Sequence, residues 1–152
     1  TLAFLGEQPD DLVEAAHDAM SALWFPAFTL QLAGLGTFGG RRPDTLWAGL
    51  RDPTPVGALH ARLLPALHGA GIVLDRRRFR PHVTLARFGR LPDDGPERLA
   101  QVMARWHGFL APPFEVADYA LWRSILTRRG AIHQELARYP LADGRGTRPD
   151  GR

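Results

Sequence analysis

An internal repeat constrains this chain more than any other feature of its sequence. The opening residues TLAFLGEQPDD return at Thr84–Asp94 as TLARFGRLPDD, with seven of eleven positions identical. After each copy comes an apolar pattern typical of an amphipathic helix, and then a segment that begins with phenylalanine, at Phe28 or Phe114. A repeat with so long a period and only two copies favours a duplicated lobe over a solenoid.

The spacing of apolar residues predicts three helices. The first should start with Asp10 as its cap and bury one face at Leu12, Ala16, Met20 and Leu23. A second is expected over Val56–Gly69, with Leu59, Leu63 and Leu67 on its buried face, and Pro65 should kink or shorten it. A third should follow LPDDGPE, with inward side chains at Leu99, Val102 or Met103, and Trp106.

Short apolar or alternating segments predict strands between the helices. They are expected at Thr1–Leu5, Phe28–Ala33, Thr45–Leu50, Ile72–Leu74, Phe79–Phe88, Phe114–Ile125 and Ala131–Leu141. Gly34–Arg42 is expected to be a loop. It matches the dinucleotide fingerprint G-x-G-x-x-G, but that motif needs a helix after its glycines, and Pro43 and a strand follow here. Residues 142–152 have nothing to bury and are expected to form a disordered tail.

Composition excludes some chemistry and permits other chemistry. The absence of cysteine excludes disulfides, cysteine-ligated zinc and thiolate nucleophiles. The net charge is +3 and all 19 basic residues are arginine, which suits a nucleic-acid partner, although codon bias also explains the absence of lysine. With no apolar run long enough to span a membrane and no recognisable signal peptide, we expect a soluble cytoplasmic protein.

His82 and Thr84, within FRPHVTL, are the strongest candidates for catalysis. In a strand these two side chains share one face, while Val83 and Leu85 share the other and can seal a core. Imidazole can give or take a proton near neutral pH, and a hydroxyl can hold a phosphate oxygen. Because the motif belongs to the repeat, the equivalent strands of two lobes should face each other across a cleft that contains paired catalytic groups.

The segment FRPHVTLAR resembles the second signature of the 2H phosphoesterases, and within them the bacterial RNA 2′,3′-cyclic phosphodiesterase family, also called 2′-5′ RNA ligase. GLGTFGGRRPDTLWAGL and LWRSILTRRGAIHQELARYPL resemble other parts of that family, although His133 stands where it commonly has tyrosine. The resemblance covers Thr1–Leu141 and implies one bilobal α+β domain over residues 1–141. Two pseudo-twofold-related antiparallel sheets would line its central groove, with helices on the outside.

The resemblance implies hydrolysis of 2′,3′-cyclic phosphate at RNA 3′ ends to a 2′-phosphate, with 2′-5′ ligation as the reverse reaction. Two histidines would act as acid and base, without metal or cofactor. His82 would be one of them, with the base as the favoured role, and Thr84 and Thr1 would bind the phosphate. RNA 3′ ends or tRNA fragments with a cyclic phosphate would be the partners of a monomeric protein.

Four further residues are expected to bind substrate. Phe4 and Arg87 occupy equivalent positions in the repeat, where the resemblance implies a clamp on the terminal base. Strict alternation puts Arg87 on the face opposite His82, so this role requires a bend in the strand. Arg80 could touch phosphate. Ser124 has no histidine or acid at a convincing local spacing, which argues against a serine nucleophile and leaves a hydrogen-bonding role in the groove.

Thr1 corresponds to the threonine of the first His-x-Thr motif, so the first catalytic histidine is expected two residues ahead of it. None of the other histidines has threonine two residues later, and all are expected to be structural or solvated: His17, His60, His68, His107 and His133. We therefore expect the natural protein to carry several tens more residues ahead of Thr1. Two alternatives stay open: a catalytically impaired module that binds RNA ends, and a 2H phosphodiesterase for another small cyclic phosphate.

Overall fold

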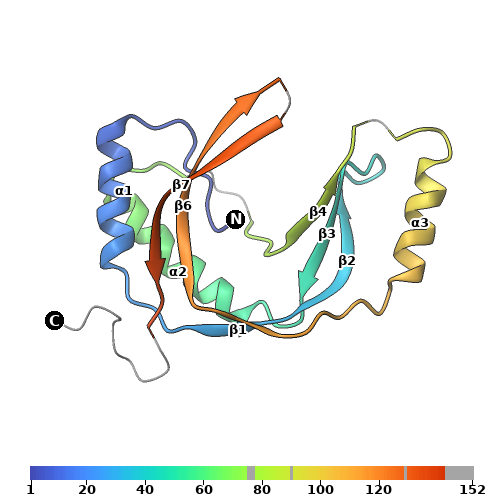
Figure 1. Cartoon of the computed structure of the whole chain (residues 1–152), viewed down its shortest axis with the longest axis horizontal. Coiled ribbons are helices and arrows are strands. Elements are labelled where there is room, and N and C mark those ends of the chain that lie inside the picture. Colours follow the sequence, from blue (N-terminus) through green and yellow to red (C-terminus); the bar gives the residue numbers. More distant parts are fainter. Residues whose placement is uncertain (75–77, 90, 129, 143–152) are drawn as a thin grey trace. The chain divides into compact units, whose positions relative to one another are not determined.

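The computed structural model describes residues 1–74, 78–89, 91–128 and 130–142 (Figure 1). It confirms the α+β class, with helices and antiparallel sheets. The elements are α1 (Asp10–Ala22), β1 (Phe28–Leu30), β2 (Leu32–Phe38), β3 (Thr45–Leu50), α2 (Thr54–Gly69), β4 (Val83–Arg87), α3 (Gly95–Arg105), β5 (Phe114–Val116), β6 (Asp118–Thr127) and β7 (Gly130–Pro140). The expected tail beyond residue 142 lies outside the described residues.

The chain forms two compact units. The first contains Thr1, Thr29–Gly57 and residues 78–114, and the second contains Leu2–Phe28 and residues 58–74 and 115–142. The second copy of the sequence repeat lies in the first unit, and the first copy, apart from Thr1, lies in the second. This division fits the two lobes that the repeat predicts.

The second unit has the larger core. Its buried side chains come from the apolar stripes of α1 and α2, from one face of the β6–β7 hairpin, and from the residues just after α2 and β7: Ala16, Met20, Leu59, Leu63, Leu67, Ile72, Tyr119, Leu121, Tyr139 and Leu141. The two tyrosines keep their hydroxyls paired, since Tyr119 donates to the Met20 carbonyl at 2.8 Å and the Tyr139 oxygen lies 2.9 Å from His17 Nδ1. His17 is thus structural, as expected.

Two details of the helices differ from the expectation. Pro9 rather than Asp10 occupies the N-cap of α1. Asp10 lies in the first turn, where its negative charge interacts favourably with the positive end of the helix dipole. Pro65 does not shorten α2, which runs on to Gly69. Pro65 is exposed and has no N–H to donate to the Ala61 carbonyl, yet the helix continues for another turn. Val102 in α3 and Trp106 just after it are 41% and 51% exposed, so the prediction that they point inward is wrong, whereas Leu99 and Met103 are half-buried.

The first unit is built on an antiparallel sheet with strand order β2-β3-β4. The sheet extends further along β2 than predicted, because Gly34–Phe38 is strand rather than loop. A register shift between Ala33 and Leu35 leaves Gly34 unpaired with φ +67°, a conformation that favours glycine, so the glycine-rich sequence serves a β-bulge. This unit's described residues fully bury one apolar side chain, Ala48.

The other strand predictions need correction. No strand forms at Thr1–Leu5 or Ile72–Leu74, and the one expected over Phe79–Phe88 is confined to β4. The long strand expected from Phe114 is interrupted at Ala117, between β5 and β6. Within the described parts of the chain, no helix combines the length and apolarity needed to cross a membrane.

Candidate active site

His82 lies immediately before β4 and is held by an aromatic wall. Its half-buried ring packs edge-on against Phe38, at 4.8 Å between ring centroids and 85° between planes, and against Trp47 at 6.2 Å and 60°. The Nδ1 atom lies 2.6 Å from the Arg80 carbonyl oxygen. A carbonyl can only accept, so Nδ1 carries the hydrogen and donates it. Nε2 is therefore the nitrogen that can take a proton from, or return it to, a bound group.

The aromatic wall depends on a glycine in the neighbouring strand. Trp47 lies across Gly36, where an added Cβ would come within 2.1 Å of the indole ring. Phe38 packs on the same indole at a centroid distance of 5.3 Å. The indole Nε1 is buried and has no hydrogen-bond partner in the structure. His82 thus rests on a layer that forms because position 36 has no side chain.

A β-bulge in β4 sets which side chains share a face with His82. Trp47 pairs with Thr84 and Leu46 with Ala86, which leaves Leu85 as the extra residue. Thr45 then pairs with Arg87. Directly paired residues point to the same face, so Arg87 shares the face of Thr84 and Trp47 despite its three-residue spacing from Thr84. The bulge thus brings Arg87 to the face of the sheet that a base-binding role requires, instead of the opposite face that strict alternation predicts.

The remaining residues of the motif are placed differently from the expectation. Val83 and Leu85, expected to seal a core, are 44% and 50% exposed because this unit supplies few apolar side chains to cover that face. The visible contribution of Arg80 is its backbone carbonyl, since its side chain is exposed. Thr1 is exposed and belongs by its contacts to the unit of His82.

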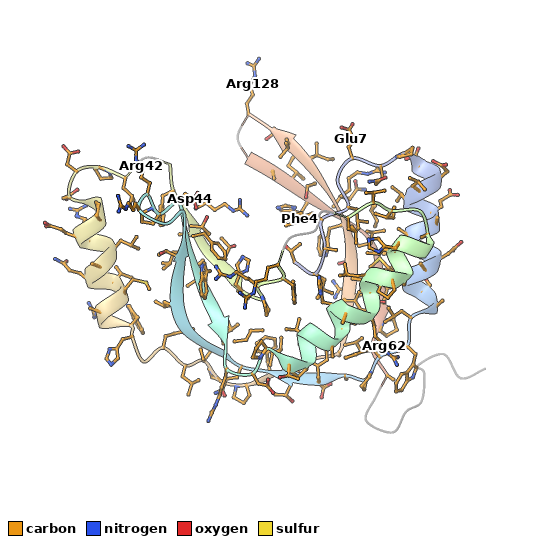
Figure 2. All side chains as sticks on the ribbon, turned by 180° about the vertical axis from the view of Figure 1, so that it is seen from behind. Phe4, Glu7, Arg42, Asp44, Arg62 and Arg128 are labelled. Carbon is orange, nitrogen blue, oxygen red and sulfur yellow. The ribbon has the colours of Figure 1, made fainter. Side chains whose placement is uncertain are left out.

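Phe4 and Ser124 belong to the second unit. Phe4, labelled in Figure 2, lies in the segment before α1 and is 78% exposed, so its ring is available to stack on a ligand. The proposed clamp of Phe4 and Arg87 joins residues of the two units and stays a prediction.

Ser124 does have an imidazole beside it, contrary to the expectation from local spacing. It pairs with His133 across the β6–β7 hairpin, and its Oγ lies 2.9 Å from His133 Nδ1. A bulge at Leu136 makes this possible, because Leu121 pairs with Ala137 while Trp122 pairs with Glu135. The signal in the sequence was the hairpin itself, in which residues on either side of Arg128–Gly130 come opposite each other.

A metal centre finds no support among the described side chains, where no group of three or more histidine or acidic residues could hold an ion. His82, the histidine that the sequence favoured, has one nitrogen fixed by the backbone and the other available to a reacting group. Together with a hydroxyl and a guanidinium on one sheet face, it could transfer a proton beside a bound phosphate.

Known proteins are similar to this chain in sequence and in fold. The chain is 34% identical over its whole length to an RNA 2′,3′-cyclic phosphodiesterase of Geobacillus stearothermophilus, and 28% identical over 90% of its length to a protein of the same name from Archaeoglobus fulgidus. It spans 46% of the first relative and 75% of the second. E.coli LigT complexed with 3′-AMP superposes with a TM-score of 0.70 at 25% identity, covering 93% of this chain and 75% of LigT.

A structure from Thermus thermophilus shares the fold, with a TM-score of 0.72 at 22% identity over 95% of this chain and 78% of that one. The model of one protein family, described as the 2′-5′ RNA ligase superfamily, matches residues 1–128, which include the whole His82 motif and the Ser124 strand. The chain belongs to the 2′-5′ RNA ligase superfamily.

Proposed function

We propose that this protein opens 2′,3′-cyclic phosphates at RNA 3′ ends and leaves a 2′-phosphate. The observation that carries the proposal is the orientation of His82, whose Nδ1 donates to the Arg80 carbonyl and whose Nε2 is left for proton transfer. Thr84 and Arg87 share a sheet face through the Leu85 bulge and supply phosphate- and base-binding groups. RNA ends, tRNA fragments among them, are the substrates of a monomeric cytoplasmic enzyme.

The chemistry needs two proton transfers. One group removes a proton from water as the oxygen attacks phosphorus, and another protonates the ribose 3′ oxygen as its bond to phosphorus breaks. His82 performs one of these steps through Nε2, with the base as the favoured role, and a second acid–base group performs the other. The Thr84 and Thr1 hydroxyls donate to the non-bridging oxygens, and Arg80 adds a positive charge.

The similar proteins support this substrate class. Relatives covering most of this chain are named RNA 2′,3′-cyclic phosphodiesterase, and LigT has been crystallised with 3′-AMP, ATP and NADP+, all of which combine a phosphate with a base. If a ribose 5′-hydroxyl replaces water as the nucleophile, the same proton transfers form a 2′-5′ bond. Ligation is therefore proposed as a second activity of the same site.

Hydrolysis should not depend on a metal ion. RNA with a 2′,3′-cyclic phosphate end is incubated with the protein in excess EDTA, and the terminal phosphate is identified by mass and by sensitivity to phosphatase. The expected product is a 2′-phosphate, formed at the same rate with and without EDTA, because imidazole supplies the proton transfers. Loss of turnover on chelation, restored by a divalent ion, would contradict the mechanism. RNA binding without turnover would support the first alternative, a catalytically impaired module that binds RNA ends. Selective turnover of a small cyclic nucleotide would support the second, a phosphodiesterase for another small cyclic phosphate.

Arg87→Ala should weaken substrate binding more than it slows the chemical step. Loss of a guanidinium that stacks on the base costs about 0.5–2 kcal/mol, which corresponds to a rise in KM of about twofold to thirtyfold. Steady-state kinetics on a cyclic-phosphate RNA separates KM from kcat. Arg98→Ala is the matched control, since Arg98 in α3 pairs with Asp94 at 2.9 Å and is equally an arginine of the first unit. A fall in kcat at unchanged KM would argue against the base-binding role.

A further inference from the structure

The β6–β7 hairpin has one face that the core does not use. Tyr119 and Leu121 of β6 point into the core, and Arg123 follows them on that side, where it approaches Asp10 of α1 at 3.7 Å. By strand alternation the opposite face of β6 carries Trp122, Ser124 and Leu126. Figure 1 shows the outer half of this hairpin extending away from α1 and α2.

The bulge at Leu136 adds His133 to this face. Without the bulge, alternation from the buried Tyr139 would turn His133 toward the core side of β7, but the observed register sets it opposite Ser124. The hydroxyl and Nδ1 lie 2.9 Å apart. Serine can donate or accept, so the pair forms with either tautomer of the ring and leaves Nε2 for a ligand. We call Trp122, Ser124, Leu126 and His133 the hairpin face.

Two large apolar side chains lie on the hairpin face beside this polar pair. Trp122 is 50% exposed and Leu126 is 85% exposed. An indole open to solvent next to hydrogen-bonding groups is the combination on which a nucleobase stacks. Such a surface recognises single-stranded nucleic acid with little preference for the base.

The outer half of the hairpin carries charge that fits a polyanion. Residues 124–134 contain two arginines and no acidic residue, while Arg123 lies on the opposite face beside Asp10. Arg128 extends from the tip in Figure 2. Glu135, at the inner end of the face, is hydrogen-bonded to Arg138, which also pairs with Asp118, and these contacts raise the pKa of Arg138. Arg138 thus offsets one of these two negative charges at the base of the hairpin.

We propose that the hairpin face binds a nucleotide of the RNA strand upstream of the cyclic phosphate end. A base stacks on Trp122, and the Ser124–His133 pair hydrogen-bonds to its phosphate or ribose. The inference rests on the proposed function and adds a second contact to it. The enzyme would then bind oligonucleotides more tightly than a mononucleotide through residues that take no part in the chemical step.

The test compares substrates of different length. Trp122→Ala and His133→Ala are assayed on a nucleoside 2′,3′-cyclic monophosphate and on single-stranded RNAs with the same end, up to about ten nucleotides long. For Trp122→Ala we expect KM to rise about tenfold on RNAs long enough to reach the hairpin. His133→Ala should give a smaller rise, of about threefold to tenfold. Both should change KM far less on the mononucleotide.

Two control variants separate binding from folding. Ile125→Ala removes a side chain of similar exposure, 46%, from the opposite face of the same strand and should leave the length dependence unchanged. Trp122→Phe keeps an aromatic ring and should restore most of the RNA affinity. Equal effects of Trp122→Ala on the mononucleotide and on RNA, or no effect at any length, would overturn the inference. Turnover of the mononucleotide by the unmodified protein tests the proposed function separately.

Discussion

Replacing His82 by alanine should lower kcat on a cyclic-phosphate RNA by about 10²–10⁴-fold, the usual contribution of a general acid or base. The ring is the one group of the motif suited to acid–base exchange, and its Nε2 is the atom left for proton transfer once Nδ1 donates to the Arg80 carbonyl. KM should change less, because phosphate and base binding are assigned to other side chains. Steady-state kinetics with circular dichroism checks both the activity and the fold.

Alanine also removes a ring that packs on Phe38 and Trp47, so a second substitution is needed. His82→Asn places an amide nitrogen where Nδ1 was, within reach of the Arg80 carbonyl, and lacks the outer ring atoms, Nε2 among them. Because an amide does not titrate near neutral pH, this variant should be as inactive as alanine, while its melting temperature should lie closer to that of the unmodified protein than the melting temperature of the alanine variant does. A folded asparagine variant that keeps most of its turnover would refute the catalytic assignment.

The sequence alone was sufficient for the features that depend on composition and spacing. The repeat indicated two lobes, and the structure divides into two units, with the second copy in one and the first copy, apart from Thr1, in the other. Helical spacing predicted the buried faces of α1 and α2, since residues such as Ala16 and Leu63 gain stability by burial wherever the helix packs. The segment FRPHVTLAR, together with GLGTFGGRRPDTLWAGL and the sequence of the C-terminal hairpin, carried the resemblance that the family match confirms.

Strand register was not predictable, and it decides which side chains of the site meet. A single unpaired residue, Leu85, reverses alternation and brings Arg87 to the face of Thr84. Leu136 does the same for His133 and Ser124. A bulge costs little free energy, and its position is fixed by packing against the partner strand. The sequence of the bulged strand alone therefore does not predict it. The same dependence on a neighbouring strand applies to Gly36, whose role is visible only in its contact with Trp47.

Gly36→Ala should both destabilise the protein and reduce its turnover. The new methyl group would lie 2.1 Å from the Trp47 ring, far inside contact distance, so the indole must move. Overpacking of this kind costs about 1–3 kcal/mol in the free energy of unfolding. Because His82 packs edge-on against the same indole, its imidazole should lose its fixed orientation, and kcat should fall more than KM rises. Thermal unfolding and steady-state kinetics measure the two effects.

Gly57→Ala is the matched control for this prediction. Gly57 lies in α2 with no atom within 4 Å of an added Cβ, so alanine should stabilise the helix by about 0.5–1 kcal/mol and leave kcat unchanged. The double variant Gly36→Ala/Trp47→Phe tests the cause, since the smaller ring makes room for the methyl group and also removes the buried, unpaired indole N–H. If the clash drives the loss, the second substitution should recover part of the stability. A Gly36→Ala protein with unchanged unfolding and turnover would show that Trp47 does not hold His82 in place.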